Sequence, residues 1–199
     1  RGVTGSWLAA WLAMLFVALS PRIFGHSMNN PKDIPFAAAF AFTTYHILQM
    51  VRQLPRPGLK SMLFTSVGIA AAISIRVGGI LLIAYLGLFL AWRYLAKAEL
   101  RADLLKITPV LKMVLYSLII VLAGFVGSLF FWPYAMENPI AHMQESLGEM
   151  SNFSTGIRML FGGEHIWSDR VPWDYLPTWF SIGAPIFMLI GLPLGLILM

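Results

Sequence analysis

The run from 62 to 95 restricts how this chain can fold, because it is almost entirely apolar over more residues than one membrane helix needs. About 20 apolar residues suffice to cross the hydrocarbon core of a bilayer. Arg76 interrupts the run and is followed by Gly78 and Gly79. An arginine at the centre of a membrane helix costs about 2.5 kcal/mol or more. We therefore predict two short spans that meet at Arg76, the alternative being one long tilted helix with a buried arginine.

The rest of the chain repeats this apolar pattern. Hydrophobic residues make up 58% of its 199 residues and charged residues only 12%, a composition typical of polytopic membrane proteins and not of soluble domains. We predict an all-α polytopic membrane protein, with one transmembrane domain over 1–199 and about six spans. The expected spans are 3–20, 34–51, 62–75, 77–95, 111–131 and 179–199.

The charges orient these spans. One side of the membrane would hold nine Lys and Arg with two Asp and Glu, concentrated at 52–60 and 93–112, while the other side holds five and seven. The positive-inside rule makes the first side cytoplasmic. Since the cations lie at span ends and not in one patch, nucleic acid is not expected as a partner. Asp33, Arg76 and the loop 132–178 then share the outer face.

Asp33 lies in a charged tip bracketed by prolines, at 29–35. A carboxylate at the mouth of a membrane helix points to function or to pairing. Asp33 can accept a proton from an acceptor hydroxyl or act as an oxygen ligand to Mg²⁺ or Mn²⁺, and Arg76 can bind two phosphate oxygens. The alternatives are that Asp33 caps a helix and that Lys32 is an interfacial residue and not a phosphate ligand.

The outer loop 132–178 contains two further features. An amphipathic helix is expected at 139–153, for packing or for lying on the membrane. Trp173 and Tyr175 belong to an aromatic cluster that either anchors the chain at the interface or contacts substrate. His165, beside Glu164, is either a polar contact or a substrate ligand.

Several segments resemble one known family. They are PRIFGH at 21–26, NPKDIPF at 30–36, MSNF at 150–153, LFGG at 160–163 and PWDYLP at 172–177. They are similar to segments of bacterial membrane glycosyltransferases of family 39, related to protein O-mannosyltransferases and lipid A aminoarabinose transferases. The resemblance covers nearly all of the chain, as the middle of a longer protein.

The resemblance implies a GT-C helical bundle that moves a sugar from a polyprenyl-phosphate donor to a protein, lipid or glycan acceptor. It places this reaction at the periplasmic face of a bacterial inner membrane. Asp33 matches the family's second acidic position, and Arg76 the basic position that meets the donor phosphate. The family's first acidic motif, which the resemblance implies to hold the catalytic base, would lie upstream of Arg1, so we expect an internal piece of the whole enzyme. On that resemblance Asp33 has either a metal-binding or an acceptor-positioning role.

Two rival functions remain open from the sequence. A secondary transporter would use Arg76 and the broken run at 62–95 as a binding site near the middle of the membrane, and it predicts inverted repeats, of which none is evident. A non-catalytic scaffold or a polymer ligase would bind a partner or a glycan through the aromatic loop.

Overall fold

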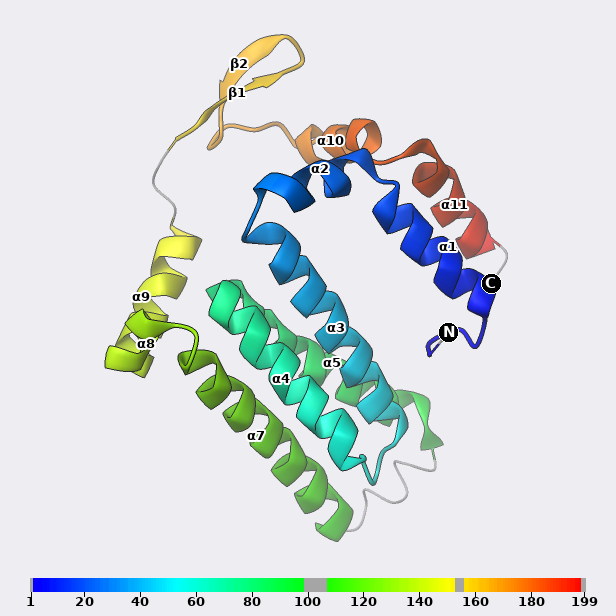
Figure 1. The fold of residues 1–199 in the computed structure, drawn as a ribbon, viewed down its shortest axis with the longest axis vertical. Coiled ribbons are helices and arrows are strands. Elements are labelled where there is room, and N and C mark those ends of the chain that lie inside the picture. Colours follow the sequence, from blue (N-terminus) through cyan, green and yellow to red (C-terminus); the bar gives the residue numbers. More distant parts are fainter. Residues whose placement is uncertain (1, 99–106, 153–155, 198–199) are drawn as a thin grey trace. The chain divides into compact units, whose positions relative to one another are not determined.

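The computed structural model describes residues 2–98, 107–152 and 156–197. The chain divides into two compact units, the first made of Arg1–Pro31 with Asn152–Met199 and the second of Lys32–Ser151. Apart from one short β-hairpin, the regular elements that the structure describes are helices (Figure 1). The predicted class, an all-α polytopic membrane fragment, is confirmed.

The second unit is a bundle in which α4 packs between α3 and α7, while α5 packs against α3 (Figure 1). The helix break predicted at Arg76 is present, because α4 ends at the residue before it and a 3-10 turn, η1, begins at the residue after it. The elements are α3 Asp33–Arg52, α4 Leu59–Ile75, η1 Val77–Ile80, α5 Leu81–Ala96 and α7 Ile107–Leu129.

Glycines let these helices approach closely. A Cβ added at Gly68 would collide with the Thr43 hydroxyl on α3, and one added at Gly124 would lie 2.7 Å from Ile69 Cγ2 on α4. The buried Thr43 hydroxyl donates to the carbonyl of Ala39 in its own helix at 2.6 Å, so its polarity is satisfied locally. Small residues at contacts of this kind are the usual basis of helix packing in membranes.

Two helices follow α7, namely α8 (Pro133–Glu137) and α9 (Pro139–Ser151). The predicted amphipathic helix corresponds to α9, and its last expected residue, Phe153, lies outside the described residues. Met143 of α9 is only 7% exposed and belongs to the hydrophobic core, and Leu147 packs against that core. The apolar stripe of α9 is therefore a packing surface along this part of the helix.

In the first unit, α1 (Trp7–Ala18) is followed by α2 (Pro21–Asn29), with a bend of 61° between them. The segment between the spans expected at 3–20 and 34–51 is therefore not a simple loop, since residues 21–29 are helical. Pro21 occupies the first turn, where a proline is well tolerated because its missing N–H would be unpaired in any case.

The same unit contains an antiparallel hairpin of β1 (Arg158–Phe161) and β2 (Glu164–Trp167). The sequence predicts only helices, so this hairpin is a correction to that prediction. Gly162 and Gly163 form the two-residue turn with φ of +62° and +88°, a combination that glycine allows and that suits the twist of a hairpin.

The C-terminal apolar run is also broken. Here α10 (Tyr175–Gly183) and α11 (Ile186–Ile197) meet at a bend of 113°, so the helices within the predicted span 179–199 are a bent pair, and the span itself stays a prediction. Ala184 precedes Pro185 and has an extended backbone, as expected for a residue whose helical conformation would clash with the following proline ring.

The number of spans follows from these elements. By length and composition, the described residues hold three helices able to cross a membrane, and up to five if each bent pair is one span. The three are Asp33–Arg52, Val77–Ala96 and Pro109–Leu129, and α4 is a shorter apolar helix. The chain is therefore a multi-pass membrane protein, whereas the count of six stays a prediction.

Candidate functional site

Asp33 and Arg76 lie at the ends of two neighbouring helices of the second unit. Asp33 is the first residue of α3, and the N-cap position is Lys32, so the interpretation of Asp33 as the cap residue is off by one. Arg76 follows the last residue of α4 with an extended backbone, φ −148° and ψ 136°. Its N–H still donates to the carbonyl of Ala72 at 3.0 Å, which anchors the break to the last turn of α4.

The two side chains form an ion pair. Arg76 Nη2 lies 2.5 Å from Asp33 Oδ1, and the side chains are 47% and 53% exposed, respectively. A pair this exposed contributes only about 0–1 kcal/mol to stability. Because both side chains are about half exposed, a ligand can still reach each charge. Binding a ligand therefore explains the pair better than stabilising the fold does.

A small apolar wall encloses the segment that follows Arg76. Gly78 is buried, and a Cβ added there would lie 3.6 Å from Met150 Sδ on α9 and 3.9 Å from Phe36 Cζ on α3. Phe36 stands almost one turn after Asp33, so the same helix supplies both the carboxylate and the wall. Phe36 and Met150 are not among the site residues predicted from the sequence. The two glycines after Arg76 were the available signal for a close approach.

Polar contacts hold α9 to α8. The Tyr134 and His142 rings stack with centroids 3.9 Å apart, and His142 Nδ1 lies 2.5 Å from the Tyr134 carbonyl oxygen. The Tyr134 hydroxyl donates to the Glu145 carboxylate, and this hydrogen bond is the main reason why the pKa of Tyr134 is raised. These contacts position α9 so that its last turn reaches the segment beside Arg76.

We expect Glu145→Gln to lower the pKa of Tyr134 toward its ordinary value of about 10. A raised pKa means that folding favours the neutral phenol. The stabilisation is therefore complete below the ordinary tyrosine pKa and is lost as the pH rises through the raised value. Tyrosinate absorbance, taken as the difference between the protein and its Tyr134→Phe variant, measures this pKa. Glu149→Gln is the control and should have a much smaller effect, since Glu149 acts only through its charge.

Lys32 occupies the N-cap position of α3, directly before Asp33, and is exposed. Its side chain makes no capping hydrogen bond, and a cation at a helix N-terminus opposes the helix dipole. This position therefore adds little to the stability of the helix. It does place a second cation next to the ion pair in the sequence.

The remaining predicted residues belong to the first unit. Tyr175 begins α10, and its ring centroid lies 5.2 Å from that of Phe161 on the hairpin, so it ties the two elements together. Trp173 is 90% exposed and His165 lies exposed on β2. Trp173 and His165 therefore present free surfaces, whereas Tyr175 also has a packing role.

A metal site was one of the roles expected for Asp33. Among the residues that the structure describes, no three His, Asp or Glu side chains gather in a way that could hold an ion. Asp33 instead faces the cation of Arg76, which opposes the approach of a second positive charge. The described residues thus do not fit an Mg²⁺ or Mn²⁺ site.

The comparisons with known proteins give one match. A family model described as dolichyl-phosphate-mannose-protein mannosyltransferase matches residues 1–138. No curated protein and no solved structure matches the chain. The matched segment runs from α1 through α8 and includes Lys32, Asp33 and Arg76, whereas His165, Trp173 and Tyr175 lie beyond it.

The match covers more than half of the 199 residues, and it includes the helices that carry the ion pair. The apolar helices agree with a membrane enzyme of this kind. The chain therefore belongs to the dolichyl-phosphate-mannose-protein mannosyltransferase family, a family of membrane glycosyltransferases of the GT-C type.

Proposed function

We propose that this chain carries the donor site of a glycosyltransferase that takes a sugar from a polyprenyl-phosphate donor and transfers it to a protein, lipid or glycan acceptor. The reaction takes place at the outer face of the membrane, which for a bacterial protein is the periplasmic face of the inner membrane. The observation that carries the proposal is the half-exposed ion pair of Asp33 and Arg76 at the ends of two membrane helices.

Arg76 binds the donor phosphate. The planar guanidinium can hold two phosphate oxygens at once, and the exposed half of its side chain leaves room for them. Lys32 adds positive charge beside this position. As the bond between the sugar carbon and the phosphate oxygen breaks, negative charge grows on the phosphate, and Arg76 stabilises that charge.

Asp33 acts on the acceptor. When the phosphate takes over the guanidinium, the carboxylate becomes available to an acceptor hydroxyl. The hydroxyl oxygen forms a bond to the sugar carbon, its proton passes to Asp33, and polyprenyl phosphate leaves. His165, Trp173 and Tyr175 are proposed to contact the sugar or the acceptor, a role supported by the exposure of Trp173 and His165.

The test uses the full-length protein in lipid vesicles with a labelled polyprenyl-phosphate sugar and follows the release of the sugar. We expect Arg76→Ala to lower kcat/KM about 100- to 1,000-fold, through a higher KM for the donor together with a lower kcat. Arg56 is an exposed arginine in the turn after α3. Arg56→Ala is therefore the matched control and should leave kcat/KM unchanged.

Unchanged transfer in Arg76→Ala would remove Arg76 from the donor site. Uptake of a substrate into the vesicles without any sugar transfer would favour the secondary transporter. Binding of a glycan with neither transfer nor uptake would favour the scaffold.

A further inference from the structure

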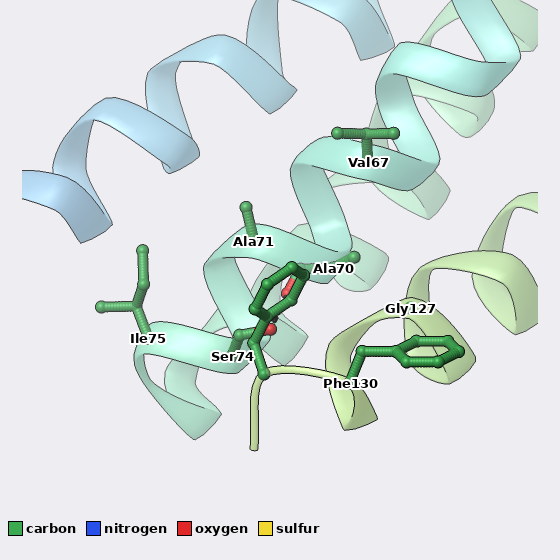
Figure 2. A pocket seen from close by; sticks show the side chains of 8 residues that line it. Val67, Ala70, Ala71, Ser74, Ile75, Gly127 and Phe130 are labelled. Atoms are coloured by element: carbon green, nitrogen blue, oxygen red, sulfur yellow. Dashed lines mark hydrogen bonds between the residues drawn. The ribbon is translucent and has the colours of Figure 1, made fainter. Parts of the chain in front are cut away.

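A groove of about 870 Å³ lies between α4 and α7 (Figure 2). It is lined by Val67, Ala70, Ala71, Ser74, Ile75, Gly127, Phe130 and Phe131. The α4 residues are spaced three and four apart and so form one stripe along the helix. From Val67 to Ile75 this stripe is about 12 Å long at 1.5 Å per residue.

The lining of the groove suits hydrocarbon. Ser74 is the one lining residue with a polar side chain, and its hydroxyl lies 2.7 Å from the Ala70 carbonyl and 3.1 Å from the Ser128 carbonyl. That hydroxyl already has partners within the protein. The groove therefore offers dispersion contacts and burial of apolar surface, and no hydrogen bond that a polar ligand would need.

Small residues open the groove, and two aromatic residues line it. A Cβ added at Gly127 would lie 3.0 Å from Ala70 Cβ, so α4 and α7 approach closely at its floor. Phe130 and Phe131 both line the groove and are 72% and 78% exposed, and Phe130 stands where α7 terminates (Figure 2). A flexible branched chain can follow such a floor, because methyl groups fit over glycine and alanine.

The groove ends, in the sequence, one residue before the candidate donor site. Ile75, which lines it, is the last residue of α4, and the next residue is Arg76. A ligand with a phosphate at Arg76 and an apolar chain attached to it would place that chain along α4. The donor named by the matched family, a dolichyl phosphate, is an isoprenoid of this shape.

We propose that the groove between α4 and α7 binds the first isoprene units of the donor lipid and that Ala71 governs how transfer depends on the length of the lipid. This inference rests on the proposed function. It adds a site for the lipid chain, distinct from the phosphate contact at Arg76. Ala71 lies midway along the stripe, so a large side chain there blocks the groove and leaves the ion pair in place.

The first experiment compares a long-chain donor with one of a single isoprene unit, in vesicles containing the full-length protein. We expect Ala71→Phe to raise the KM for the long-chain donor about tenfold, equal to about 1.4 kcal/mol, and to leave the KM for the short donor unchanged. Ala41→Phe, at an exposed alanine of α3 outside the groove, is the matched control and should change neither value.

The second experiment is independent of turnover. A polyprenyl phosphate with a photoreactive group on its third isoprene unit should label peptides of α4 and α7 that line the groove, and Ala71→Phe should abolish this labelling. Equal KM increases for both donors in Ala71→Phe, or labelling confined to other helices, would overturn the groove proposal while leaving the proposed function intact.

Two further outcomes separate the alternatives. If excess phosphatidylglycerol prevents the labelling and unlabelled polyprenyl phosphate does not, the groove binds bulk phospholipid and the proposal fails. If the unmodified protein transfers no sugar from either donor, the proposed function fails, and the labelling pattern alone decides whether the groove binds an isoprenoid.

Discussion

Asp33→Asn should lower sugar transfer by the full-length protein about 100- to 10,000-fold, the range expected when a general base is removed. The amide has nearly the shape of the carboxylate, so the first turn of α3 should be kept. It cannot take a proton from an acceptor hydroxyl, and it no longer neutralises Arg76, which lies 2.5 Å away. The loss should therefore appear in kcat, with the KM for the donor unchanged or lower.

Measuring kcat and KM separately distinguishes a catalytic role of the Asp33–Arg76 pair from a purely structural one. Arg76→Ala should raise the donor KM as well as lower kcat, and Asp33→Asn should lower kcat alone, whereas a purely structural ion pair would give the same changes in kcat and KM in both variants. Glu137→Gln is the control, because Glu137 is an exposed carboxylate at the end of α8. Asp33→Glu keeps the charge and should recover part of the activity. Full activity in Asp33→Asn would contradict the proposed role of Asp33.

The pairing of Asp33 with Arg76 follows from the membrane topology, and that topology can be predicted from the sequence. Charge bias assigns the start of one span and the break in a later run to the same face of the membrane, and Asp33 and Arg76 do meet. The break itself follows from an arginine and two glycines within an apolar run. Sequence could predict this much because spans alternate in direction and a charge is costly inside the bilayer.

The errors have physical causes. The helix at 21–29 is hard to predict because its polar side chains obscure a short helix, although Pro21 is a signal for its first turn. The hairpin has only a weak signal in the sequence, namely Gly162 and Gly163 in its turn, since its strands are only four residues each. The groove between α4 and α7 has no counterpart in the sequence, since its shape depends on how Gly127 and Ala70 pack across two helices.

Gly79→Ala should destabilise the second unit and disturb the donor site. A Cβ at Gly79 would lie 2.5 Å from the carbonyl carbon of Ala72 and from the amide nitrogen of Ile73, which belong to the backbone of α4. A backbone cannot rotate away as a side chain does, so η1 must shift. Overpacking of this kind typically costs about 1–3 kcal/mol. The melting temperature of the purified full-length protein should fall by several degrees.

The shift of η1 should also reach Arg76, because the Gly79 N–H donates to the Arg76 carbonyl at 2.9 Å. Gly79→Ala should therefore raise the donor KM even at temperatures where the protein stays folded. Gly87→Ala is the matched control on α5, where an added Cβ meets nothing within 4 Å and alanine favours the helix by about 1 kcal/mol. If Gly79→Ala proved as stable as Gly87→Ala, η1 would not lie against α4, and the backbone geometry that holds Arg76 opposite Asp33 would be wrong.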